Sequence, residues 1–211
     1  MEHITEKTIG NYRIRTFYDE SPESPRNWDN LGTMVCFHRR YDLGDKHDYN
    51  FNDYNGWNEM EKDIIKKEKV GVILPLYLKD HSGITMNTTG FNCRWDSGQV
   101  GFIFISKEKI REEFKIKRIT KEWVEKITEY LKGEVETYDQ FLRGNVFGYR
   151  TYKVSICSLG HEHEEEIDSC WEFYSEEECF NEAEGIVNYR IENEVVTDEN
   201  FSDMLHSVDK N

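Results

Sequence analysis

Alternating and continuous apolar positions along the chain mark its expected strands. Residues 11–19 (NYRIRTFYD) alternate apolar and polar side chains, which is typical of a half-buried strand. Further segments of this kind predict strands at residues 33–38, 70–79, 84–89, 99–105, 146–156 and 167–174. Pro75 lacks an N–H donor and therefore favours an edge position or a bulge within its strand. Short turns between several of these segments favour antiparallel pairing.

Apolar residues at spacings of three and four predict helices elsewhere. The expected helices cover residues 58–69, 107–114, 120–142 and 175–194. Ser106 and Thr120 fit helix N-caps, and Ser175 with Glu178 fits a capping box, in which each residue satisfies an N–H group of the first turn. Residues 41–57 are rich in Asp, Asn, Gly and Tyr without a period, which indicates a long loop.

These elements together predict an α+β fold, an antiparallel sheet with helices packed on one face. We expect a single domain over residues 1–195 with one continuous core. Within it, residues 145–195 form an acidic hairpin–helix unit. The polar residues 196–211 are expected to form a mobile tail.

Charged residues are distributed unevenly along the chain, and this is the most informative feature of its composition. The 211 residues contain 27 Lys plus Arg and 42 Asp plus Glu, a formal net charge of -15. Residues 1–159 hold 25 acidic and 25 basic side chains, whereas residues 160–211 hold 17 acidic side chains against Arg190 and Lys210. The whole net charge thus comes from the last quarter of the chain. Such a block is either a solvated surface or a face that docks a basic partner.

Composition and motifs exclude several classes of function. No apolar run reaches the roughly 18 residues that a membrane span needs, so we expect no membrane association. The acidic balance argues against direct binding of phosphate backbones. No P-loop, dinucleotide-binding, hydrolase-elbow or zincin motif occurs, and no cofactor is predicted. The polar N-terminus lacks an apolar signal core, which favours a cytoplasmic protein.

Two groups of side chains are of types that bind divalent metals. They are His38, Asp42, Asp45 and His47 in one group, and His161 and His163 in the other. Neither spacing matches a standard ligand set. The alternative interpretations are a hydrogen-bonded loop for the first group and an exposed hairpin tip over residues 160–166 for the second.

A third group holds the residue types of nucleophilic catalysis. It comprises Asp80, His81 and Ser82, with Cys93 and Asp96 nearby in the sequence. The DHSG sequence is equally explained as a turn. The odd number of cysteines, five, and their wide spacing favour reduced thiols that fill a core. The basic residues between 107 and 126 alternate with acids, as in helical charge pairs.

Three motifs carry a resemblance to a known group of proteins. They are NWDNLGTMVC with HRRY at residues 27–41, PLYL with DHSGI at 75–84, and CRWDSGQVG at 93–101; CWEFY at 170–174 accompanies them. With them the chain resembles, over Tyr12 to Tyr189, a family of hypothetical proteins of bacteriophages and mobile elements. The family has no known activity, so no catalytic residue is implied. The resemblance implies a genomic setting in which small acidic proteins often inhibit host restriction or CRISPR systems, some by mimicking DNA.

The leading hypothesis is therefore a non-enzymatic anti-defence protein in the host cytoplasm. Its acidic face would bind a host nuclease or guide-RNA effector protein in place of nucleic acid. The expected contacts are Glu164, Glu165, Glu166, Trp171, Tyr174, Glu176, Glu177 and Glu178. One alternative is a metal-dependent hydrolase or nuclease that uses the segment from His38 to His47, or a Cys/His enzyme that uses His81. Another is a structural or regulatory phage protein that forms a homo-oligomer.

Overall fold

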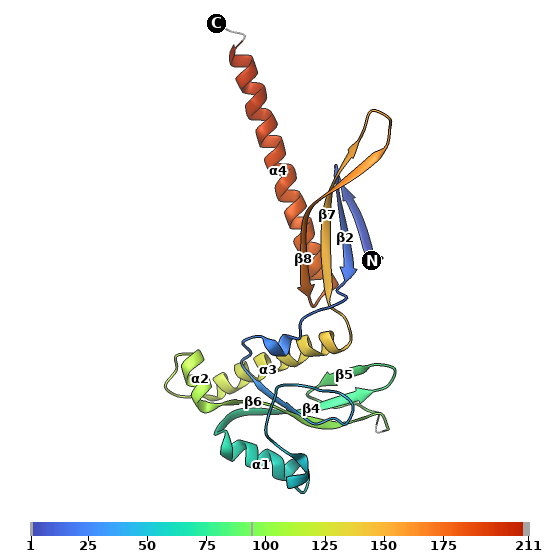
Figure 1. Cartoon of the computed structure of the whole chain (residues 1–211). Coiled ribbons are helices and arrows are strands. Elements are labelled where there is room, and N and C mark those ends of the chain that lie inside the picture. The colour runs from blue at the N-terminus through green and yellow to red at the C-terminus, as the bar shows by residue number, and fades with distance from the viewer. Residues whose placement is uncertain (1, 94, 209–211) are drawn as a thin grey trace. The chain divides into compact units, whose positions relative to one another are not determined.

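The computed structural model describes residues 2–93 and 95–208, with side chains up to residue 194. Helices and antiparallel strands both contribute, so the predicted α+β class is confirmed (Figure 1). The chain divides into two compact units. Unit 1 comprises Met1–Pro22 and Gly144–Asn211, and unit 2 comprises Glu23–Arg143. The chain of unit 2 thus interrupts the chain of unit 1.

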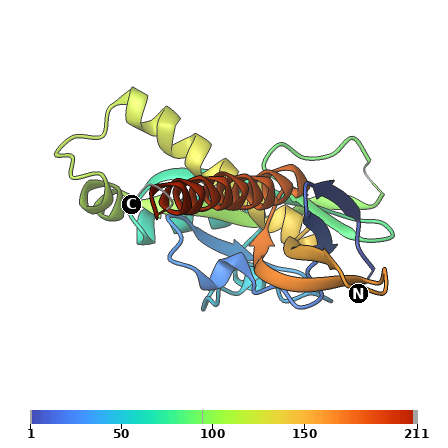
Figure 2. The same cartoon turned by 90° about the horizontal axis from the view of Figure 1, so that it is seen from above.

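Unit 1 is a four-stranded antiparallel sheet with one long helix on one face (Figures 1 and 2). Its elements are β1 (Thr5–Ile9), β2 (Tyr12–Tyr18), β7 (Phe147–Ile156), β8 (Glu162–Phe173) and α4 (Glu176–Val208), and the strand order is β1-β2-β7-β8. Alternation along β2 buries Tyr12 and Ile14 against Ala183 and Val187 of α4. The intervening β2 residues lie on the sheet face that α4 leaves open.

Unit 2 is a second four-stranded antiparallel sheet, with strand order β3-β6-β4-β5. Its strands are β3 (Thr33–Cys36), β4 (Val70–Asp80), β5 (Ile84–Asn87) and β6 (Ser97–Ser106). Its helices are α1 (Trp57–Lys67), α2 (Lys107–Glu113) and α3 (Lys121–Leu142), and short 3-10 turns cover Pro25–Asn27 and Phe51–Asp53.

Helices cover both faces of the sheet in unit 2, rather than the single face expected. Residues of α3 such as Leu131 join one buried cluster with Ile103 of β6. Met60 and Ile64 of α1 join another with Phe102 and Phe104. Consecutive β6 residues therefore supply opposite cores, which is why the apolar run at 99–105 is continuous instead of alternating.

The division into units differs from the single domain expected over residues 1–195. The buried residues form separate clusters, two in unit 2 and one in unit 1, instead of one continuous core. The expected hairpin–helix unit at 145–195 is not complete by itself, because β2 pairs with β7 along its whole length. The short strand β1, which lies in the polar N-terminal segment, was not predicted.

Cap chemistry predicted from the sequence is present at the helix starts. The hydroxyl of Ser106 accepts from the Lys109 N–H at 3.1 Å, and that of Thr120 accepts from the Trp123 N–H at 3.4 Å. Ser175 likewise accepts from the Glu178 N–H at 3.3 Å. Each hydroxyl satisfies an N–H group that has no partner inside its helix.

Two segment boundaries differ from the sequence expectation, and Pro75 lies next to a register shift in a central strand. β4 is a central strand, but Pro75 lies before the stretch that pairs with β5, and a register shift follows Leu76. β8 begins at Glu162, so most of the predicted tip at 160–166 is strand. α4 continues to Val208, into the tail predicted from residue 196. The side chains of that extension and the tail's mobility lie outside the described residues. No helix in the described part of the chain has the length and apolarity needed to cross a membrane.

Candidate functional site

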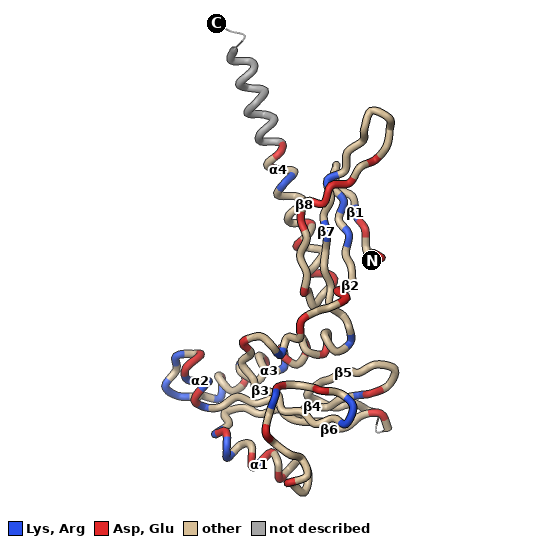
Figure 3. Tube along the Cα trace, in the orientation of Figure 1, with Lys and Arg blue, Asp and Glu red and all other residues tan. Residues whose placement is uncertain are grey.

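The acidic excess of the molecule belongs almost entirely to unit 1. Unit 1 has 21 acidic and 7 basic residues, a net charge of -14, whereas unit 2 has 21 and 20, a net charge of -1. Figure 3 shows acidic residues of unit 1 along β8 and α4, and the described basic residues of the unit are spread over β1, β2, β7 and α4. The candidate interaction surface therefore depends on which of these carboxylates are paired within the unit.

The β8 carboxylates on the open face of the sheet are paired with arginines of β2. Both oxygens of Glu164 accept from the Arg15 guanidinium at 2.7 Å. Arg13 donates to Glu162 at 2.8 Å and contacts Glu164 as well. Hydrogen bonding by Arg15 holds the pKa of Glu164 below its ordinary value. The carboxylate of Glu164 is thus part of an ion-pair network within the unit, and its negative charge is balanced by Arg13 and Arg15.

The same face continues into an aromatic and guanidinium cluster. Arg150 of β7 lies 3.6 Å from a carboxylate oxygen of Glu166, and its guanidinium lies 5.6 Å from the ring centre of Trp171 and 5.7 Å from that of Phe17. The Trp171 ring covers Gly148, where an added Cβ would collide with it. Trp171 is therefore half-buried against its own sheet, which limits its role as a contact for a partner.

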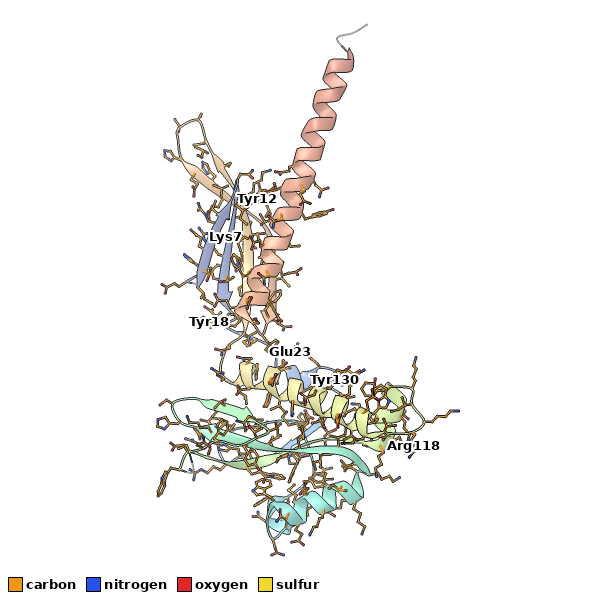
Figure 4. The ribbon with its side chains drawn as sticks, turned by 180° about the vertical axis from the view of Figure 1, so that it is seen from behind. Lys7, Tyr12, Tyr18, Glu23, Arg118 and Tyr130 are labelled. Atoms are coloured by element: carbon orange, nitrogen blue, oxygen red, sulfur yellow. The ribbon has the colours of Figure 1, made fainter. Side chains whose placement is uncertain are left out.

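Acids at the edges of α4 that approach the sheet are paired with lysines. Glu184 lies 2.7 Å from the Lys7 amine, and Glu194 accepts from Lys153 at 2.6 Å and from the Tyr12 hydroxyl at 2.7 Å. Lys7 and Tyr12 belong to β1 and β2, the strands seen beside α4 in Figure 4. These pairs attach the helix to the sheet.

The solvent side of α4 carries exposed carboxylates in a line. We define the outer stripe of α4 as Glu178, Glu182, Tyr189 and Glu192, all of which are exposed. Their spacings of four, seven and three residues place them on one side of the helix, away from the buried stripe that includes Ala183. Tyr189 is 68% exposed, and Gly185 leaves open space within the line.

The predicted contact residues therefore fall into different environments. Glu164 and Glu166 form ion pairs, and Glu176 accepts from the Thr5 hydroxyl at 2.8 Å. Trp171 and Tyr174 are half-buried. The remaining three, Glu165, Glu177 and Glu178, are exposed.

The sequence reasoning missed Glu182, Tyr189 and Glu192. They lie on the helix side opposite the buried residues Ala183 and Val187, and the helical spacing of these two apolar residues was the available signal.

The first proposed metal group does not converge on one point. Asp45 binds Arg26 at 2.9 and 2.7 Å and accepts from the Met34 N–H, so its oxygens are occupied. His47 contacts the carbonyl oxygen of Cys36 at 3.0 Å, and His38 faces a different carboxylate, that of Asp80.

The other proposed metal ligands are exposed. They are Asp42, His161 and His163. Among the described residues, no group of three or more His, Cys, Asp or Glu side chains is arranged to hold a metal ion.

Three side chains of the third group come together, those of His81, Cys93 and Asp96, but in an order unsuited to nucleophilic catalysis. Asp96 Oδ2 lies 3.2 Å from His81 Nδ1 and 3.6 Å from Cys93 Sγ. The carboxylate thus contacts both groups, whereas thiol activation requires the imidazole to contact the sulfur.

The cysteines are free thiols, as expected, but they are not all core residues. Burial raises the pKa of the Cys36 and Cys179 thiols to about 12, which makes both unreactive. Cys170, by contrast, is exposed, and it lies on β8, which is an edge strand of the sheet.

Comparison with known proteins does not assign this chain to a family. No protein-family model, curated protein or solved structure matches this chain.

Proposed function

We propose that unit 1 is a binding module that docks on a basic surface of another protein through the outer stripe of α4. The observation that carries this proposal is the separation of charge. A net charge of -14 lies in unit 1, and the ion pairs found among the described residues of the unit do not include the outer-stripe carboxylates of Glu178, Glu182 and Glu192.

The chemistry of the outer stripe suits a partner rich in Lys and Arg. Carboxylates that repeat along a helix present negative charge at regular intervals, and Tyr189 adds a rigid aromatic contact with a polar tip. Complementary charge accelerates association and selects the partner more than it raises affinity. The resemblance to phage-borne proteins directs the proposal to one class of partner, a host defence nuclease or guide-RNA effector whose basic channel normally holds nucleic acid.

The ion-pair network on the sheet has a supporting role in this proposal. Arg13 and Arg15 reduce the repulsion among the β8 carboxylates, which would otherwise oppose the compact state. The unit can therefore keep its excess negative charge on α4 while the sheet remains folded.

The test combines phage plating with a purified system. Bacterial strains that each carry one restriction or CRISPR system express the full chain, and plating of a sensitive phage measures protection. For a system that is inhibited, the purified nuclease is titrated with the chain at low and high salt while DNA binding is followed. We expect competition with DNA that weakens as salt increases.

Variants of the outer stripe give the decisive comparison. The double reversal Glu182→Lys with Glu192→Lys should weaken binding about tenfold or more. The control, Glu112→Lys with Glu113→Lys, makes the same change in net charge on exposed residues of unit 2 and should leave binding unchanged. Equal loss in both variants, or no loss in the first, contradicts docking through the outer stripe.

A further inference from the structure

Unit 2 contains a polar pocket that is independent of the surface proposed above. Its volume is about 370 Å³, and it lies where the loop after β3, the end of β4 and the start of β6 meet. We name it the Trp95 pocket and define it by His38, Arg40, Asp80, Trp95 and Asp96 among its lining residues. It brings together His38, from the first proposed metal group, with Asp80 and Asp96, from the group considered for nucleophilic catalysis.

Trp95 is the unusual feature of this pocket. Its side chain is 96% exposed, more than any other large hydrophobic residue in the described part of the chain. The loop that presents it is held on both sides: the Asp80 N–H donates to the Asp96 carbonyl oxygen at 2.7 Å, and the Ser97 hydroxyl donates to the Cys93 carbonyl oxygen. An indole that lies in solvent at the rim of a pocket, next to hydrogen-bonded flanking residues, indicates a binding role.

The described side chains that line the pocket are balanced in charge. The carboxylates of Asp80 and Asp96 are matched by the guanidiniums of Arg39 and Arg40, and Arg40 pairs directly with Asp80. Burial lowers the pKa of His38, so its imidazole is neutral at pH 7. The described lining residues therefore offer hydrogen-bond acceptors and donors and have no net charge that would attract an ion.

We propose that the Trp95 pocket binds a neutral carbohydrate. A sugar ring has an apolar C–H face that packs on an indole, and hydroxyl groups around its edge. Those hydroxyls would donate to the carboxylates of Asp80 and Asp96 and accept from Arg40. Gly98 leaves the adjacent wall open, since an added Cβ there would meet no atom within 4 Å. A phosphate-bearing ligand fits less well, because its charge would be repelled by the carboxylates of Asp80 and Asp96 while Arg40 is already paired with Asp80.

The test uses the full chain and saturation-transfer NMR with maltotriose, cellotriose and chitotriose, and with AMP as the charged comparison. We expect saturation of ring protons in at least one trisaccharide and none in AMP. Trp95→Ala should weaken that binding about tenfold, as loss of one aromatic stacking partner does. Asp80→Asn, which retains the side-chain shape, should weaken it as well.

Tyr130→Ala is the matched control, because this exposed aromatic residue on α3 does not line the pocket (Figure 4). Binding that survives in Tyr130→Ala and is lost in Trp95→Ala supports the proposal. Three outcomes overturn it: no signal from any trisaccharide, a signal from AMP alone, or equal binding by wild type and Trp95→Ala. Circular dichroism of each variant shows that the fold is retained.

Discussion

The two units use charged side chains in opposite ways. In unit 2, the Arg26 side chain is 4% exposed and donates to Asp45, Glu134 and the Gly32 carbonyl oxygen, which ties the segment before β3 to α3. In unit 1, Arg13 and Arg15 lie on an open sheet face and bind carboxylates that remain partly in solvent. The buried ion pairs of Arg26 thus stabilise the fold of unit 2. The ion pairs of Arg13 and Arg15 lie at the surface of unit 1, where another molecule can contact them.

Removing the buried charge of unit 2 is expected to have the largest effect on stability. Arg26→Met leaves Asp45 and Glu134 without their cation and should reduce the free energy of unfolding by about 3–5 kcal/mol. Chemical denaturation measures the loss, and hydrogen exchange should localise it to unit 2. Arg26→Lys keeps the charge but not the two-pronged geometry, so it should fall between wild type and Arg26→Met. If the free energy of unfolding of Arg26→Met falls by less than about 1 kcal/mol, the network contributes no more than an ordinary surface ion pair.

A pair of glycine substitutions compares the rigidity of the two sheets. An added Cβ at Gly101 of β6 meets the backbone of Val35 in β3, whereas at Gly148 of β7 it meets the movable ring of Trp171. We expect Gly101→Ala to cost about 2–3 kcal/mol and Gly148→Ala about 1 kcal/mol, because overpacking is cheaper where a side chain can shift. Thermal unfolding of both variants shows which substitution lowers stability more. The reverse order would show that the Trp171 ring is the more rigid neighbour.

The surface network of unit 1 is expected to contribute least. Glu164→Gln removes the bonds to Arg13 and Arg15 and should lower stability by about 0.5–1 kcal/mol. Because the pKa of Glu164 is held below its ordinary 4.5, this contribution is present above pH 4.5 and is lost as the pH falls through the folded-state pKa. Melting temperature measured against pH should fall less steeply at acid pH in Glu164→Gln. Parallel curves for wild type and variant would contradict the assignment.

Local signals in the sequence predicted most of the elements but not their assembly. Alternation at 11–19, the caps at Ser106 and Thr120 and the apolar stripe of 120–142 each correspond to an observed element. The division into two units depends on β2 pairing with β7, a contact between distant segments that no local pattern encodes. β1 was missed because its residues are polar and only partly buried.

The candidate surface was predictable in charge but not in orientation. Counting residues located the acidic excess after residue 160. Which carboxylates face arginines depends on the sheet order, which brings Arg15 of β2 across β7 to Glu164 of β8. The Trp95 pocket likewise required His38 and Asp80 to lie together, which follows from β6 pairing with both β3 and β4.

The interrupted chain of unit 1 has a consequence for the order of events during synthesis. β2 leaves the ribosome well over a hundred residues before its partner β7, while every strand of unit 2 finds its neighbours within Glu23–Arg143. Unit 2 can therefore fold on the nascent chain while β1 and β2 still lack a partner. Since α4 follows β8, the proposed docking surface on α4 is assembled after the rest of unit 1. A translation product that stops before β7 would contain a folded unit 2 without any means of engaging the proposed target.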